Sequence, residues 1–373
     1  MIKIRLATVF SGIGSVEFAL RRLDIPHEVV FACDNGERDI KYDKDKELDI
    51  IRNLKTVEEK KVYVDRLYDS KTKKHNFVRD TYLNNYSIKD DLFFQDINLL
   101  DGNDFKNQVD LFVGGSPCQS FSLVGSQRGL KDIRGTLFAE FARLIKEIEP
   151  KVFIYENVRN VIKHDNGRTW EVIKNAFDEL EYEISYKILN AKDFNIPQKR
   201  SRLFVIGYKK SFGIKPIIPE KNEIPLQYTM QDFLVTHTAY GNFNYNEDGS
   251  LKLDQSRQDD VPVECILSKA VKEYVLKEGT KNWHQKVETD LPIARTLLKT
   301  MGNCHRAGVD NYVTENGNLR MLSVRECLRL MGYTDDFRIT VSKAQTYKQV
   351  GNSIVVDVMM ELVKCIISQK VLD

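Results

Sequence analysis

One cysteine stands in an unusual setting, in the stretch VDLFVGGSPCQSFS at residues 109–122. An apolar run the length of a buried strand breaks at two glycines and leads through Ser116 and Pro117 to Cys118. A proline fixes its own φ and pushes the preceding residue into an extended conformation, so the approach to the cysteine is rigid. Open α/β sheets bind ligands just past the carboxyl ends of their strands, and a thiolate there is a strong nucleophile. We weigh this interpretation of Cys118 against a small buried apolar residue, which most free cysteines are.

Charged side chains border two further apolar segments. Glu156 directly follows the apolar run 152–155. Burial would raise the pKa of this carboxyl, so that it could protonate a ring nitrogen. A helix-capping acid is the alternative. Alternation before the apolar strand 203–207 puts Arg200 and Arg202 on one face, where two guanidinium groups suit a carbonyl, phosphate or carboxylate. An ordinary surface ion pair is the alternative.

The N-terminal segment has the pattern of a nucleotide-type site. A predicted strand over residues 2–10 leads through Gly12 and Gly14 into an apolar helix face. The third glycine of a dinucleotide fingerprint is absent, and a plain strand-to-helix turn is the alternative. Asp34 ends the next predicted strand, where a ribose would be held, and Asp96 ends a third and could accept a hydrogen bond from an amine.

Composition sets bounds on the class of protein. The 373 residues are 42% hydrophobic and 29% charged with a net charge of +2, which is ordinary for a globular protein and gives no overall basic signature for nucleic acid. Six cysteines without a C-x-x-C pair argue against a zinc ribbon and a disulfide framework, and we predict no metal site. No run reaches membrane-spanning length and no signal peptide is evident, so we expect a cytoplasmic protein.

Alternating strand and helix patterns predict a doubly wound α/β sheet, with helices near 77–86 and at 137–148. The lysine-rich stretch 36–75 is expected to be a surface insertion, and from about 209 the pattern becomes irregular. Ser323 and Glu326 fit a capping box. The predicted organisation is a catalytic and cofactor-binding domain at 1–208 plus 343–373 and a smaller domain with hinge at 209–342.

Together and in this order, the motifs resemble those of the cytosine-C5 DNA methyltransferases of the prokaryotic restriction-modification type. They are FSGIGS, GGSPCQSFS, RGTLF, ENV, IPQKRSRLF, RMLSVRECLRLMGY and YKQVGNS. The resemblance implies a Rossmann-like S-adenosylmethionine-dependent methyltransferase sheet and a smaller, irregular target-recognition domain. It implies methyl transfer to C5 of a cytosine flipped out of double-stranded DNA at a specific short sequence. It further implies action as a monomer, with a cognate restriction endonuclease as a functional partner.

The resemblance also implies site residues. Cys118 would attack C6 of the base, Glu156 would hold N3 and the exocyclic amine, and Arg202 would contact O2. Arg200 supports the site, and Gln119 completes the catalytic set. For the cofactor, the family pattern names Phe10, Ser11, Gly12 and Gly14 for the methionine part, Asp34 for the ribose, and Asp96 and Ile97 for the adenine. Pro117, Leu137 and Asn352 would complete the pocket, and Asn35 and Ser353 are further cofactor-binding residues. The DNA contacts that it implies are Ser122, Gln127, Arg128, Arg295, Thr296 and Leu297.

Three alternatives stay open. A tRNA cytosine-5 methyltransferase of the same fold shares the motifs, but those relatives usually carry Pro-Pro-Cys where this chain has Ser116-Pro117-Cys118. A dinucleotide oxidoreductase would account for the glycine turn alone and leave the cysteine and Glu156 unexplained. A catalytically silent DNA-binding protein would not need an intact set of Cys118, Glu156 and Arg202.

Overall fold

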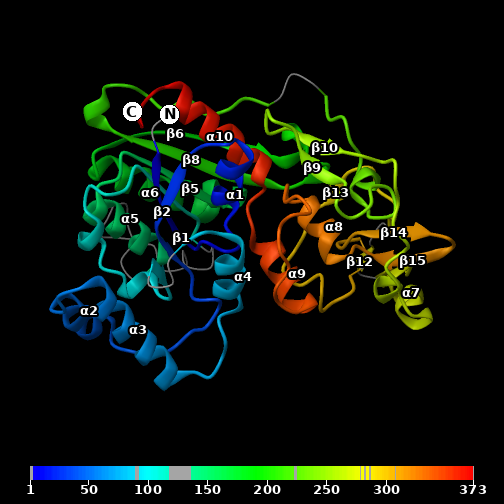
Figure 1. The fold of residues 1–373 in the computed structure, drawn as a ribbon, viewed down its shortest axis with the longest axis horizontal. Helices are drawn as coiled ribbons and strands as arrows, with labels where there is room; N and C mark the ends of the chain where they lie inside the picture. The colour runs from blue at the N-terminus through cyan, green and yellow to red at the C-terminus, as the bar shows by residue number, and fades with distance from the viewer. Residues whose placement is uncertain are drawn as a thin grey trace.

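The computed structural model describes residues 3–88, 92–116, 136–221, 225–277, 279–280, 283–284, 287–306 and 308–372. A seven-stranded sheet dominates the fold, in the order β3-β2-β1-β4-β5-β8-β6 (Figure 1). The strands are β1 (Ile4–Val9), β2 (His27–Cys33), β3 (Phe93–Phe94), β4 (Leu111–Gly114), β5 (Val152–Val158), β6 (Tyr182–Asn190) and β8 (Ser201–Lys209). Strands β1 to β5 pair in parallel, and β8 pairs antiparallel with both β5 and β6. The predicted α/β fold class is confirmed.

Helices cover both faces of the sheet because successive side chains of a strand point to opposite sides. Leu6 of β1 packs in a cluster with α1 (Ser15–Arg22) and α10 (Val356–Ser368), whereas Ala7 packs with α5 (Leu137–Ile148) and α6 (Arg168–Glu179). The strand order reverses between β1 and β4, which is where doubly wound sheets form a ligand crevice. The predicted helix at 137–148 is confirmed, and the side chain of Thr136 caps it.

The predicted insertion forms two helices, α2 (Lys44–Arg52) and α3 (Val57–Lys71), which lie at one corner of the molecule (Figure 1). A capping box starts α3. The ammonium group of Lys60 lies 2.8 Å from the Asp101 carboxylate and 2.7 Å from that of Asp104, so α3 is tied to the segment after β3. The chain returns through α4 (Phe77–Asn85), as the sequence predicted.

The region after β8 is irregular, as expected. Its elements are β9 (Phe243–Tyr245), β10 (Leu251–Leu253), α7 (Lys269–Val275), β11 (Gly279–Thr280), β12 (Trp283–His284), β13 (Ala294–Arg295), β14 (Tyr312–Glu315), β15 (Asn318–Met321) and α8 (Val324–Arg329). The short β13 pairs with β7 (Gln198–Lys199), and α9 (Lys343–Asn352) follows α8. The predicted capping box at Ser323 and Glu326 is confirmed.

The smaller region shares a hydrophobic core with the sheet. Phe233, Leu328 and Tyr333 belong to the same buried cluster as Leu6 of β1. A second, small cluster around Val275 belongs to the outer part of the region alone. The domain limits at 208 and 343 therefore stay a prediction, and the packing joins the two parts closely. In the part of the chain that is described, no helix is long and apolar enough to cross a membrane.

Candidate active site

A cavity of about 310 Å³ lies at the carboxyl ends of the central strands. It collects residues that are far apart in the sequence, from the ends of β1, β2, β4 and β5 to α9. Its described lining is Phe10, Gly12, residues 34–37, Phe77, Val78, Gly115, Ser116, residues 156–158, Arg200, Arg202, Lys299, Gln345, Lys348, Gln349, Gly351 and Asn352. Pockets for one small ligand typically measure about 300–1,000 Å³, so this cavity has the size of a small-ligand site.

The predicted acid and arginines meet in this cavity. Arg202 Nε lies 3.1 Å from Glu156 Oε1, and both side chains are largely buried, at 19% and 15% exposed. Burial raises the pKa of Glu156, and the charges of Arg202 and Arg200 oppose this shift. A carboxyl with a raised pKa beside a fixed guanidinium can both donate to and accept from a ring with alternating nitrogen and carbonyl groups.

Arg200 is buried and holds the backbone around the site. Its guanidinium donates to the carbonyl oxygens of Leu297 at 2.9 Å, Gly351 at 3.0 Å and Ser353 at 2.7 Å. Burial lowers the pKa of Arg200, and the neighbouring Arg202 lowers it further. The three carbonyl oxygens stabilise the charged form, so Arg200 links the smaller region and the end of α9 to the catalytic strands.

The predicted nucleophile Cys118 lies outside the described residues, together with Pro117, Gln119, Ser122, Gln127 and Arg128. The segment that leads to them is described and tightly held. Asn157 Nδ2 donates to the carbonyl of Ser116 at 2.9 Å, and the hydroxyls of Ser116 and Tyr155 lie 2.7 Å apart. A side chain at Gly115 would put its Cβ 2.7 Å from Glu156 Oε2 and 3.1 Å from the Glu156 carbonyl oxygen, so a larger residue there would displace the predicted acid.

The glycine turn after β1 forms the other half of the cavity. Phe10 has a φ of 53°, which is strained for a residue with a side chain and is typical of functional sites. The amides of Gly12 and Gly36 donate to the Asp34 carboxylate at 3.0 and 2.8 Å, and burial raises the pKa of Asp34 against these hydrogen bonds. Ser11 fixes the turn to β2, since its Oγ accepts from the Cys33 amide at 3.0 Å.

The residues predicted for the adenine lie beside the insertion and outside this lining. Asp96 and Ile97 are each 6% exposed. Asp96 Oδ2 accepts from the hydroxyls of Tyr42 at 2.5 Å and Tyr68 at 2.9 Å, while Oδ1 accepts two hydrogen bonds from Asn98. The insertion therefore reaches a predicted cofactor residue, which its charged composition did not indicate.

Three more predicted cofactor residues are absent from the lining of this cavity. Leu137 begins α5 and packs against a buried cluster of the sheet and its helices. Gly14 starts α1 with a φ of 72°, and Tyr86 covers it so closely that a Cβ would lie 2.2 Å from that ring. Ser353 is buried, and its hydroxyl lies 2.9 Å from that of Tyr333.

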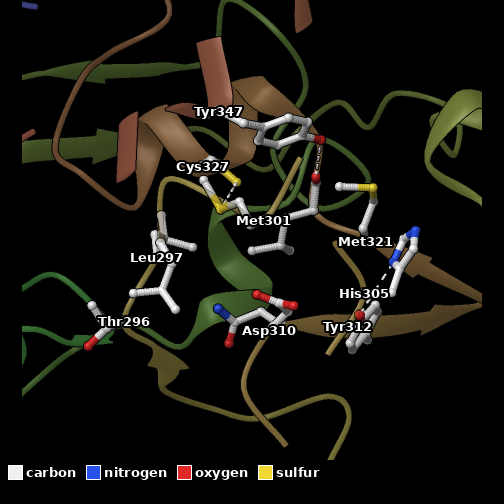
Figure 2. Close-up of a pocket in the computed structure, with 12 residues that line it drawn as sticks. Thr296, Leu297, Met301, His305, Asp310, Tyr312, Met321, Cys327 and Tyr347 are labelled. Atoms are coloured by element: carbon white, nitrogen blue, oxygen red, sulfur yellow. Dashed lines mark hydrogen bonds between the residues drawn. The ribbon is translucent and has the colours of Figure 1, made fainter. Parts of the chain in front are cut away.

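The described residues predicted to contact DNA lie at or next to a second cavity. Leu297 is 1% exposed and points into this second cavity beside Met301 and Cys327, where an apolar side chain is stabilised by burial (Figure 2). Arg295 donates to the carbonyl oxygens of Glu288 and Asp310, at 3.1 and 3.2 Å. Thr296 is partly exposed, and its hydroxyl donates to the carbonyl of Lys199. Contacts of Arg295, Thr296 and Leu297 with DNA stay predictions.

Comparison with known proteins decides the family. Residues 4–368 match the sequence model described as C-5 cytosine-specific DNA methylase. The chain belongs to this family. Transfer of a methyl group to cytosine C5 is the activity of C-5 cytosine-specific DNA methylases, and the predicted enzyme class is confirmed.

Several relatives and solved structures resemble this methylase. It is 36% identical to the type II methyltransferase M.HhaI of Haemophilus parahaemolyticus, over 67% of this chain and 73% of that one. It is 33% identical to M.SsoII of Shigella sonnei, over 78% and 72% of the two chains. The crystal structure of Dnmt2 methyltransferase from S. pombe shares the fold, with a TM-score of 0.65, 17% identity and 99% of each chain covered.

Sequence reasoning missed a charged cluster at the cavity of this C-5 cytosine methylase. Glu37 accepts from Lys348 Nζ at 2.6 Å, from Lys299 Nζ at 3.3 Å and from Asn352 Nδ2 at 3.2 Å. Burial raises the pKa of Glu37, but the two lysines outweigh it and the net shift is downward. No local pattern marks these residues, because the contacts join segments more than 260 positions apart.

Proposed function

We propose that the protein transfers a methyl group from S-adenosylmethionine to C5 of a flipped-out cytosine within a short, specific duplex DNA sequence, through a covalent adduct between Cys118 and C6. The observation that carries the proposal is the Glu156–Arg202 pair, which shares one cavity with the glycine turn and Asp34. The cavity therefore combines a polar pair that can hydrogen-bond a base with a glycine turn of the kind that binds nucleotides.

The chemistry follows from the poor nucleophilicity of cytosine C5. Attack of the Cys118 thiolate on C6 forms a C–S bond and shifts electron density to C5. Glu156 would hold N3 and the exocyclic amine, and offset charge that develops on the ring, while Arg202 would contact O2. After C5 has accepted the methyl group, its proton leaves to a base. The C6–S bond then breaks and returns the thiolate of Cys118.

The described residues fit S-adenosylmethionine, which supplies the methyl group when bound. The Asp34 carboxylate is fixed by two amides and can still accept from ribose hydroxyls. Phe10, Gly12, Asn35 and Asn352 line the same cavity, so backbone and amide groups surround the cofactor site. Asp96 and Ile97 lie behind the insertion, and their contact with the adenine rests on the resemblance.

DNA is the proposed macromolecular partner. A stacked base cannot admit attack on C6 from above the ring plane, so the target cytosine has to leave the duplex. We place sequence recognition in the irregular region at 209–342. We further propose that the protein acts in the cytoplasm and modifies DNA before a paired restriction endonuclease can cut it. The protein acts as a monomer in this scheme, because each strand can be methylated separately.

Trapping of the covalent adduct tests the proposal. A pool of random-sequence duplexes containing 5-fluorocytosine, incubated with protein and S-adenosylmethionine, is expected to give an adduct that survives denaturing electrophoresis, because fluorine at C5 cannot leave as a proton. Cys118→Ser should give none, whereas Cys304→Ser, at an exposed free cysteine, should behave as the wild type. Efficient methyl transfer without any adduct, or an adduct with Cys118→Ser, would contradict the proposed mechanism.

A further inference from the structure

A further hollow, separate from the cavity beside Leu297, lies behind the glycine turn. It shares Phe10, Gly12, Gly115 and Asn352 with the lining of the active-site cavity, so the two adjoin. Its inner wall includes Glu17, in the first turn of α1. Neither the family motifs nor the proposed methyl transfer uses this carboxyl group.

Glu17 is almost fully buried and incompletely satisfied. It is 1% exposed, and its Oε1 accepts from the Tyr82 hydroxyl at 2.5 Å and from Thr8 Oγ1 at 3.1 Å. Its Oε2 is buried and has no hydrogen-bond partner among the described residues. A buried polar atom without a partner costs about 1–3 kcal/mol, and because Glu17 lines the hollow, a donor group of a ligand bound there would remove this cost.

Glu17 also has no ion-pair partner within the described part of the chain. Burial raises its pKa, although the hydrogen bonds from Tyr82 and Thr8 and the charge of His27 oppose the shift. A carboxylate is expensive to bury alone and becomes stable when a cation is brought to it. A small cationic donor that enters from the active-site side therefore fits the open oxygen.

We propose that Glu17 Oε2 binds the α-ammonium group of the methionine portion of S-adenosylmethionine. This inference rests on the proposed function, because the cofactor's position near Phe10 and Gly12 brings its amino-acid end to this hollow. An ammonium group carries three donors and no acceptor, which complements an unpartnered carboxylate oxygen. Asn352 and Ser353 line the same hollow and offer donors for the cofactor's carboxylate.

Two ligands that differ in the amino-acid portion test the inference by calorimetry. Glu17→Gln keeps an oxygen for Tyr82 and Thr8 but removes the charge. We expect it to weaken S-adenosylhomocysteine binding about 10- to 100-fold, the range for one hydrogen bond to a charged group, and to leave 5′-methylthioadenosine binding within about twofold. Unchanged S-adenosylhomocysteine affinity, or an equal loss for both ligands, would overturn the inference.

A measurement on the wild-type protein tests the same inference even if Glu17→Gln does not fold. An S-adenosylhomocysteine analogue without the α-amino group should bind the wild-type protein at least about tenfold more weakly than S-adenosylhomocysteine itself. Equal affinity would overturn the role of Glu17 while leaving the proposed function intact. A wild-type protein that binds neither S-adenosylhomocysteine nor 5′-methylthioadenosine would instead overturn the proposed function and the inference together.

Discussion

Arg202 Nε lies 3.1 Å from Glu156 Oε1, and the strands that carry the two residues are hydrogen-bonded neighbours in the sheet. Val158 at the end of β5 is directly opposite Arg202 in β8, which sets the ion pair by strand register. Groups fixed on strands hold their geometry better than groups on loops. The register of two paired strands therefore fixes the position of the Glu156–Arg202 pair at the cavity.

Glu156→Gln tests the acid. The amide cannot give up a proton to a ring nitrogen, so we expect methyl transfer to slow about 10²- to 10⁴-fold, the range for loss of a general acid. S-adenosylhomocysteine affinity should stay within about threefold, corresponding to less than 1 kcal/mol. Single-turnover rates and calorimetry measure the two quantities. Glu171→Gln, at a mostly exposed position on α6, is the matched control, and a similar rate for both variants would remove Glu156 from the mechanism.

Asn157→Ala tests how β5 holds the segment before the cysteine. The change leaves the buried Ser116 carbonyl without its donor at 2.9 Å, so we expect about 1–3 kcal/mol less stability toward urea and a slower methyl transfer. Asn160→Ala, three residues further along the chain at an exposed position, serves as the control. If Asn157→Ala loses stability but keeps the wild-type rate, the contact supports the fold only.

Tyr68→Phe tests the link between the insertion and Asp96. The buried carboxylate loses one of the two hydroxyl donors on Oδ2, and we expect the free energy of unfolding to fall by about 1–3 kcal/mol. Tyr63→Phe removes a hydroxyl from the same helix, where it donates to Glu47 away from Asp96, and should cost less because it is partly exposed. Urea unfolding compares the variants. Equal losses of unfolding free energy in the two variants would show that the hydrogen bond to Asp96 stabilises the protein no more than the partly exposed one to Glu47.

Glu17 gives the ligand-free protein a pH-dependent stability. Its folded-state pKa is raised above the ordinary value of about 4.3, so the folded protein holds this proton more tightly than the unfolded chain. The contribution is fully present below the ordinary value and is lost as the pH rises through the raised folded value. Thermal melts should therefore favour Glu17→Gln over the wild type increasingly with pH in that window. A difference between the two melting temperatures that does not change with pH would contradict the assignment.

Local sequence patterns predicted the helices and strands well, but they could not predict contacts between residues far apart in the sequence. Strand-turn-helix periodicity placed Gly12 and Asp34 correctly at one cavity, because parallel strands end at the same edge of a sheet. The hydroxyls of Tyr42 and Tyr68 on Asp96 could not be foreseen, since a charged segment gives no sign of what it covers. The burial of Leu297 could not be foreseen either, because a short motif carries no periodicity that distinguishes a buried face.

Bisulfite sequencing of duplex DNA treated with the purified protein and S-adenosylmethionine tests the central claim most directly. A C5 methyl group protects cytosine from conversion, so we predict protected cytosines confined to one short sequence, and none with Cys118→Ala. Complete conversion at every site, by a folded protein that binds S-adenosylhomocysteine, would contradict duplex DNA as the substrate.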